Sequence, residues 1–191
     1  MRIAAVLLVT LIWNTAFGQK AVYHEISRQL AEGRRMQEVS LVKFVTNDVS
    51  NRAYSTEGLA KGTILSLDQD AVSQLMTTQN EFIQLVVPVD ERHQLKLDLI
   101  KSRIFSEDFN LFTSDQPGIP VNYTAGIHYK GIIDGDPTSL VAISVFDNEI
   151  MGLIASDAGN LVLGRLNNDR EDRHILYADR DLDRASDFVC G

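Results

Sequence analysis

The sequence from Ile127 onward is divided into short apolar segments by clusters of turn-forming residues. Gly, Pro, Asn and Asp favour tight turns, and the intervening segments are rich in β-branched residues. Short strands joined by such turns pair most readily with their neighbours along the chain, so this pattern predicts an antiparallel meander of four or five strands. The turn clusters are Asp134-Gly135-Asp136-Pro137, Asp147-Asn148, Asp157-Ala158-Gly159-Asn160 and Asn167-Asn168.

Three earlier segments share the two-residue period of a β-strand, and they span residues 41–46, 82–87 and 94–100. A polar turn at residues 90–93 separates the last two, so we expect a hairpin with one buried face. Near the end of the chain, the stretch 175–177 is flanked by residues of both charges, and we expect an edge strand there.

A short N-terminal helix is predicted by Val22, Ile26 and Leu30, which recur every fourth residue. We expect it to end near residues 33–35, where Gly33 occurs.

A second helix is expected to start at Ser66, whose hydroxyl can cap the first turn while Gln69 reaches back to it. We expect this helix to end at residues 78–80. Its expected apolar face consists of Leu67, Ala71, Leu75 and Met76.

The first 18 residues have the pattern of a signal peptide. Arg2 provides a positive charge before an apolar run at residues 3–12, which is too short to span a bilayer. Small residues stand two positions apart at Ala16 and Gly18, so we expect cleavage between Gly18 and Gln19 and secretion of the chain. The alternative is a buried N-terminal helix.

Taken together, these patterns predict an α+β fold that is predominantly antiparallel β, a meander or sandwich-like sheet with one or two short helices. We expect a signal peptide at 1–18, an N-terminal helical segment at 19–39, a β-rich domain at 40–183 and an exit linker at 184–191.

Charge and cysteine content narrow the choice of partner. The chain has a formal net charge of −8, and removal of residues 1–18 takes away Arg2 alone among the charged residues, which gives −9. A strongly acidic chain disfavours nucleic acid and anionic membranes as partners. With one cysteine, Cys190, no internal disulfide can form, and the fold depends on its hydrophobic core.

No familiar catalytic motif occurs in the sequence. It contains no HExxH, no G-x-S-x-G and no glycine-rich phosphate loop. We expect His24, His93, His128 and His174 to be solvated side chains rather than metal ligands. The aspartates at 179, 181 and 183 lack the glycine and glutamate of a calcium loop, and a turn explains Asp134-Gly135-Asp136 more simply.

Cys190 is the remaining candidate for chemistry. A thiolate is a strong zinc ligand, and one carried on an extended segment can enter the open coordination site of a catalytic zinc. Gly191 follows it, and a residue without a side chain permits close approach to a metal cleft. The alternatives are an ordinary thiol or one that pairs with another chain.

The segment 128–144 resembles the pro-region of adamalysin/reprolysin-type secreted zinc metalloproteases, in their bacterial form. That family has a tyrosine-x-glycine strand, here at Tyr129 and Gly131, then a glycine-containing turn and a strand with Ser-x-x-x-x-Ser, here Ser139 and Ser144. Further matches are Gly152 in the next strand, the strand at residues 160–166, and a strand led by His174.

The resemblance implies a prodomain that assists folding of a zinc endopeptidase and keeps it latent. Cys190-Gly191 resembles the family's cysteine switch, so the implied role of Cys190 is to ligate the zinc of the protease domain, while this chain binds no cofactor alone. Animal members carry a cysteine where this chain has residues 145–148, and no catalytic domain follows Gly191 in this sequence. The chain is therefore a fragment or acts in trans.

Two other functions remain open. An extracellular β-sandwich binding or adhesion module would leave Cys190 without a role. A stand-alone protease inhibitor would use the same thiol chemistry without a covalently attached protease.

Overall fold

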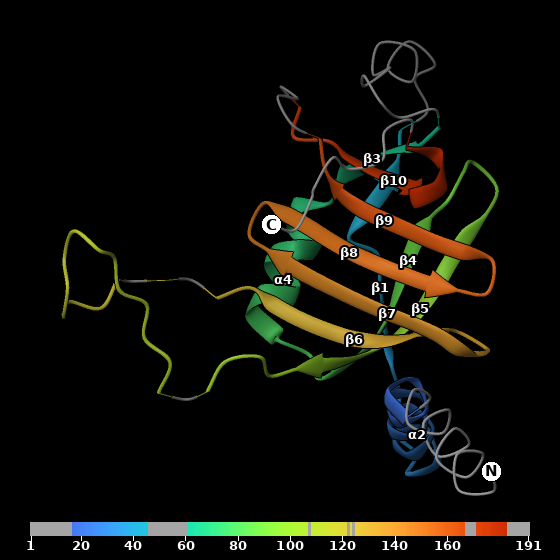
Figure 1. Ribbon diagram of the computed structural model, residues 1–191. Coiled ribbons are helices and arrows are strands. Elements are labelled where there is room, and N and C mark those ends of the chain that lie inside the picture. Colours follow the sequence, from blue (N-terminus) through green and yellow to red (C-terminus); the bar gives the residue numbers. More distant parts are fainter. Residues whose placement is uncertain are drawn as a thin grey trace, which may run out of the picture.

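The computed structural model describes residues 17–45, 61–106, 108–121, 123, 125–166 and 171–182. Within these residues the strands form a single curled sheet (Figure 1). In spatial order its strands are β1 (Gln37–Val39), β4 (Phe82–Pro88), β5 (Gln94–Ser102), β6 (Ile127–Ile133), β7 (Asp136–Phe146), β8 (Glu149–Ser156), β9 (Gly159–Arg165), β10 (His174–Ala178), β3 (Thr63–Leu67) and β2 (Val42–Phe44). The predominantly antiparallel fold is confirmed, as one sheet rather than two stacked sheets.

The strands from β4 to β10 form an antiparallel meander, and the one parallel pair among the described strands is β1 with β4. The predicted hairpin is confirmed as β4 and β5. The expectation of an edge strand at 175–177 is wrong, because β10 lies between β9 and β3. Ile175 and Leu176 are buried on opposite faces of this strand, as an interior position requires.

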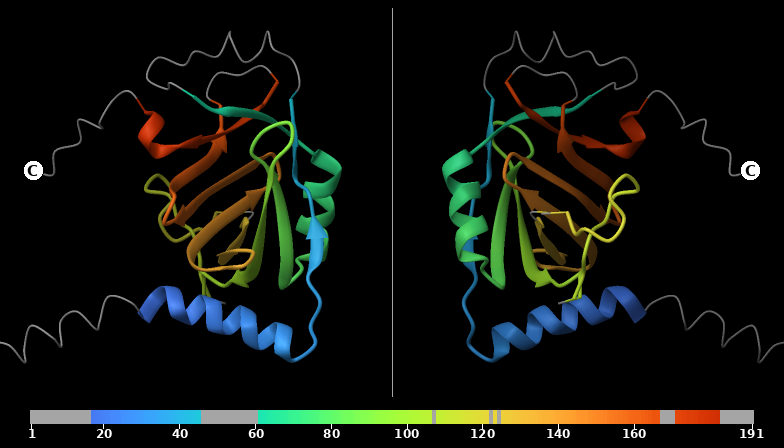
Figure 2. Two further views of the ribbon diagram at one scale, coloured as in Figure 1. Left: turned by 90° about the vertical axis from the view of Figure 1, so that its right-hand side faces the viewer. Right: turned by 90° about the vertical axis from the view of Figure 1, so that its left-hand side faces the viewer.

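The two ends of the sheet are consecutive in the chain. Only Ser40 and Leu41 separate β1, which pairs with β4, from β2, which pairs with β3. Leu41 is fully buried, and its carbonyl accepts a hydrogen bond from the backbone N–H of Asp68 at 2.8 Å. Figure 2 shows the curl that brings the two ends together.

Helix α4 (Gln69–Thr78) is capped by Asp68, so the prediction that Ser66 caps it is wrong. Ser66 is part of β3, where it pairs with Lys43 of β2. The Asp68 carboxylate accepts from the backbone N–H of Ala71 at 3.2 Å, which is the usual role of an N-cap side chain. At the other end Gln79 adopts a left-handed conformation with φ of 48°, close to the predicted end.

The main hydrophobic core lies inside the curl. Leu75 and Val72 of α4 pack there against inward-facing residues from both halves of the sheet. Ala71 and Met76 are partly buried against the same core, whereas Leu67 belongs to β3. The inward side chains of the meander are Ile83, Leu85, Val87, Leu97, Leu99, Ile127, Tyr129, Val141, Ile143, Val145, Ile150, Ile154, Leu163 and Leu176.

Helix α2 (Phe17–Ala31) lies on the outer face of the sheet, away from α4 (Figure 2). Val22 and Ile26 pack against Phe82 and Ile132, as their spacing predicts. Leu30, the third residue of the predicted face, is 45 % exposed. None of the helices described is long and apolar enough to cross a membrane.

Candidate functional site

An exposed apolar region lies on the outer face of the meander, beside the connection between β5 and β6. This connection, residues 103–126, is called the arm below. Its described part contains no helix or strand and projects away from the sheet (Figure 1). Exposed apolar side chains follow one another along it: Ile104, Phe105, Phe109, Leu111, Phe112, Ile119, Val121 and Tyr123.

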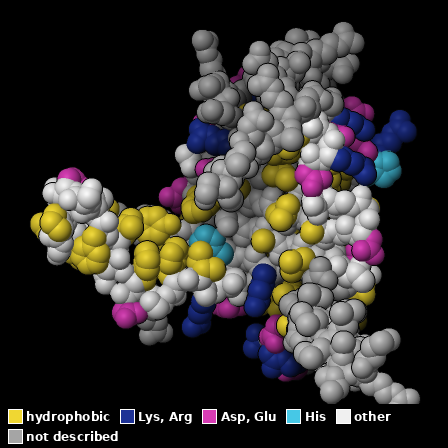
Figure 3. All heavy atoms as spheres, viewed as in Figure 1, with side chains coloured by type: hydrophobic (Ala, Val, Ile, Leu, Met, Phe, Trp, Pro, Cys, Tyr) yellow, Lys and Arg dark blue, Asp and Glu magenta, His cyan; other side chains and the backbone are white. Residues whose placement is uncertain are grey.

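A groove of about 550 Å³ separates the base of the arm from the strands. Its floor is made of small residues of β7 and β8, including Ala142, Ser144 and Gly152. Met151 and Leu153 of β8 rise beside this floor and are 41 % and 47 % exposed. Figure 3 shows apolar side chains along the arm and scattered over the neighbouring sheet face. The groove and the apolar part of the arm are together called the outer apolar surface.

His128 of β6 connects the arm to the sheet. Its ring lies edge-on between Phe105 of the arm, with centroids 6.0 Å apart, and Phe146 of β7, at 5.9 Å. Its Nδ1 is 2.9 Å from the hydroxyl of Ser144. Nε2 is buried without a hydrogen-bond partner among the described residues. Burial lowers the pKa of His128, so the imidazole is neutral at neutral pH.

The prediction that the histidines are solvated is confirmed for His24 and His93. His93 lies in the β4–β5 turn, 2.8 Å from the Asp90 carboxylate. The prediction is wrong for His174, which is fully buried in β10 and whose Nε2 accepts from the backbone N–H of Ile150 at 3.1 Å. It is also wrong for His128, which is partly buried under the arm. Burial lowers the pKa of His174.

No group of three His, Cys, Asp or Glu side chains in the described residues is placed to hold a metal ion. At the 134–136 turn Gly135 has a φ of +76°, which supports the turn interpretation. The Asp136 carboxylate accepts there from the backbone N–H of Thr138 at 2.9 Å and from its hydroxyl at 2.7 Å.

Asp98 is the buried acid of the described residues and is 4 % exposed on β5. The side-chain amide of Gln84 donates to it at 2.9 Å, and burial raises its pKa. A buried acid of this kind is a common mark of catalysis. Its hydrogen-bonding partner is an amide rather than a nucleophile or a base, so the arrangement lacks the second group that general acid–base chemistry needs.

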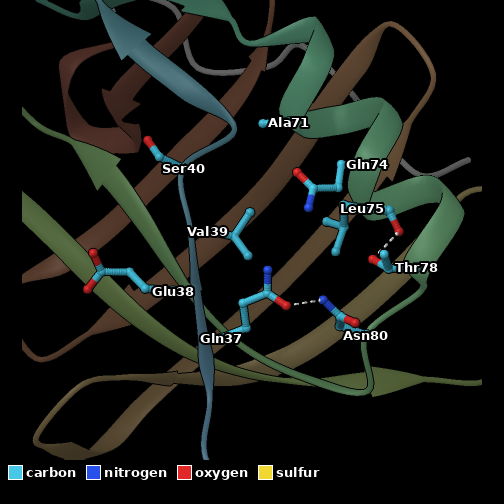
Figure 4. Close-up of a pocket in the computed structure, with 9 residues that line it drawn as sticks. All are labelled: Gln37, Glu38, Val39, Ser40, Ala71, Gln74, Leu75, Thr78 and Asn80. Atoms are coloured by element: carbon cyan, nitrogen blue, oxygen red, sulfur yellow. Dashed lines mark hydrogen bonds between the residues drawn. The ribbon is translucent and has the colours of Figure 1, made fainter.

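A smaller polar cavity of about 150 Å³ lies between β1 and α4 (Figure 4). Asn80 donates to the side chain of Gln37 there at 2.6 Å. Glu38, the ionisable residue of its lining, points away from the other side chains and pairs with Lys96 at 2.8 Å. The cavity therefore holds neutral polar groups and no reactive pair.

The serines and histidine of the resemblance have structural roles. The hydroxyl of Ser139, which is fully buried, donates to the carbonyl of Asp136 at 2.7 Å and accepts from the backbone N–H of Ile133 at 2.8 Å. It therefore ties the two strands of the β6–β7 hairpin together. Ser144 contacts His128, and His174 joins β10 to β8.

The tyrosine and glycines of the resemblance also serve the fold. The hydroxyl of Tyr129 donates to the carbonyl of Asn80 at 2.8 Å. A Cβ atom at Gly131 would lie 2.0 Å from the carbonyl oxygen of Asp98, and one at Gly152 would lie 2.3 Å from Ile143. Only glycine fits where neighbouring atoms approach so closely.

The structure does not test the site residues expected from sequence. Cys190 and Gly191 lie outside the described residues. Gly18 and Gln19 belong to the first turn of α2. The outer apolar surface was not predicted, because its residues come from five strands and an aperiodic connection. The sequence signal that could have revealed it is the high content of Phe, Ile and Leu in residues 103–126, between β5 and β6.

Comparison with known proteins does not identify a family for the chain. No protein-family model matches the chain, and no curated protein is significantly similar to it in sequence.

Proposed function

We propose that the chain is the prodomain of a secreted zinc metalloprotease, as the resemblance of residues 128–177 implies, and that Cys190 is its inhibitory thiol. The observation that supports the proposal is a β domain whose last described residues lie shortly before a cysteine in the sequence. The last described element is the 3₁₀ helix η1 (Asp179–Asp181), and Cys190 follows Leu182 by eight residues. Eight residues span at most about 28 Å, which limits the reach of the thiol from Leu182.

The chemistry of the proposal requires no metal site in this chain. The protease supplies the zinc, and the Cys190 thiolate takes the coordination position that a water molecule needs for attack on a substrate. Gly191 leaves room for the backbone to enter the cleft. Activation follows when the basic-rich exit is cut, near Arg170, Arg173, Arg180 or Arg184, or when the thiol is oxidised.

Export is the second part of the proposal. Residues 1–18 act as the signal peptide, and cleavage between Gly18 and Gln19 leaves all but the first two residues of α2 in the mature chain. Val22 and Ile26, which fix α2 to the sheet, are retained.

The test is inhibition of a purified adamalysin-type catalytic domain by the mature chain, with the Cys190→Ser variant as its matched control. The wild-type chain is expected to inhibit, and the variant to lose at least about tenfold in affinity, which corresponds to about 1.4 kcal/mol. Equal inhibition by both chains would remove Cys190 from the mechanism. A complete lack of inhibition by the wild-type chain would contradict the proposed function.

An extracellular binding module is the second candidate, and the outer apolar surface is the observation that favours it. Such a module would bind its partner equally well with serine at position 190. The same pair of chains therefore distinguishes the two functions.

A further inference from the structure

Two hollows adjoin at Ile104 and Phe105, and no segment in the described part of the chain covers them. One is the groove over β7 and β8. The other is a hollow of about 340 Å³ within the arm, lined by Phe105, Phe109, Val121 and Tyr123. The ring centroids of Phe105 and Phe109 are 4.4 Å apart, so the arm begins with a packed aromatic pair.

The chemistry of this surface suits another protein better than a small molecule. Small-molecule sites enclose the ligand and orient it with a few convergent polar groups. Here the groove is open and mostly apolar, and of its polar groups His128 Nδ1 is already paired with the hydroxyl of Ser144 at 2.9 Å. Met151 and Leu153 instead present open, aliphatic contact area of the kind found in protein interfaces.

The chain leaves the domain beside this same surface. The carboxylate of Asp179 in η1 accepts from the side-chain amide of Asn160 at 2.7 Å, which holds η1 against β9. Strand β9 contributes Val162 to the groove. Figure 2 shows η1 on the side of the molecule where β7, β8 and β9 lie. A partner that is held by Cys190, within about 28 Å of Leu182, can therefore reach the groove.

Charge adds a requirement on the partner. The arm carries Asp108 and Asp115, and hydrogen bonds from Ser106 and Thr113, respectively, lower the pKa of each carboxyl. Both are therefore charged at neutral pH. A matching surface is apolar at its centre and basic where it faces the arm.

We infer that the outer apolar surface is the docking surface for the catalytic domain of the protease that Cys190 inhibits. This inference rests on the proposed function and adds where the partner binds. The thiol blocks the metal, and the surface supplies affinity that does not depend on the thiol.

The test compares variants of the mature full chain for binding to a purified adamalysin-type catalytic domain by surface plasmon resonance. Leu153→Glu places a charge in the groove. Leu30→Glu is the matched control, because Leu30 is 45 % exposed on α2, outside the groove. Both side chains point to solvent, and circular dichroism melting checks that both variants fold. Phe112→Asp, at a side chain that is 50 % exposed on the arm, is the second test variant.

We expect Leu153→Glu and Phe112→Asp each to raise the Kd at least about tenfold, and Leu30→Glu to change it less than about twofold. The loss is expected to persist in a Cys190→Ser background. If the wild-type chain inhibits through Cys190 while both test variants bind normally, the docking inference fails and the proposed function stands. If the wild-type chain neither binds nor inhibits, both fail.

Discussion

Asp98 carries a carboxyl group at a buried position of β5, where an uncharged side chain is usual. It lies on the outer face of β5, is 4 % exposed, and accepts from Gln84. Burial favours its protonated form and raises its pKa in the folded state. As the pH rises above the unfolded pKa of about 3.9, the unfolded chain releases this proton first. Folding stability therefore falls with rising pH because of this group.

We predict that Asp98→Asn stabilises the protein at pH 7. The asparagine carbonyl can still accept from Gln84, and no charge has to be buried. The gain in free energy of unfolding should be small at pH 3 and should grow as the pH rises through the folded pKa of Asp98. Urea unfolding at several pH values measures it, with Asp157→Asn in the exposed β8–β9 turn as the control. A gain that is independent of pH would contradict this explanation.

The cap of α4 shows how far single residues could be assigned from sequence. Ser66 and Asp68 are both good N-cap residues. The choice between them depends on the pairing of β3 with β2, which extends the strand as far as Leu67 and places Ser66 within it. That pairing joins distant parts of the chain, so local sequence could not decide it.

Among the elements, the β6–β7 hairpin combines a tight turn with a buried hydroxyl. The register between these strands shifts between Gly131 and Ile133. Ser139 supplies the acceptor that the backbone N–H of Ile133 needs. The hairpin therefore depends on one side chain where its strand register is irregular.

We predict that Ser139→Ala lowers the free energy of unfolding by about 1–3 kcal/mol, because it leaves the backbone N–H of Ile133 without its acceptor. Urea denaturation followed by circular dichroism measures the change. Ser73→Ala, on the exposed side of α4, should change it by less than about 0.5 kcal/mol. If the two variants lose the same stability, the hydroxyl of Ser139 is not needed.

Elements with a clear period were predictable, and those fixed by distant pairing were not. The alternation in β5 and the turns between β6 and β9 gave the meander correctly. Strand β1 has three residues, which is too short for a period, and it was not predicted. The interior position of β10 depends on β3, which lies more than a hundred residues earlier in the chain.

At the scale of the whole molecule, the curl separates two apolar environments. Residues 37–44 join the two ends of the sheet and enclose the main core, while α2 covers only part of the outside. The uncovered part and the arm form the outer apolar surface. Its residues are far apart in sequence and follow no common period, so only the folded chain shows that they belong together.

The motif that carries the family resemblance has a physical explanation at this scale. Gly131, Ser139, Gly152 and His174 each hold neighbouring strands of the meander at close distance. Their spacing in the sequence therefore reflects where neighbouring strands of the meander come into close contact. The proposed inhibitory chemistry resides elsewhere, in a thiol on the segment that leaves this sheet.

Whether that thiol reaches the metal of the protease is the central claim, and cobalt spectroscopy tests it directly. A purified adamalysin-type catalytic domain with Co²⁺ in place of zinc is titrated with the mature chain. The account predicts a thiolate-to-cobalt charge-transfer band in the near ultraviolet that saturates at one equivalent and is absent with Cys190→Ser. Binding of the wild-type chain without such a band would contradict it.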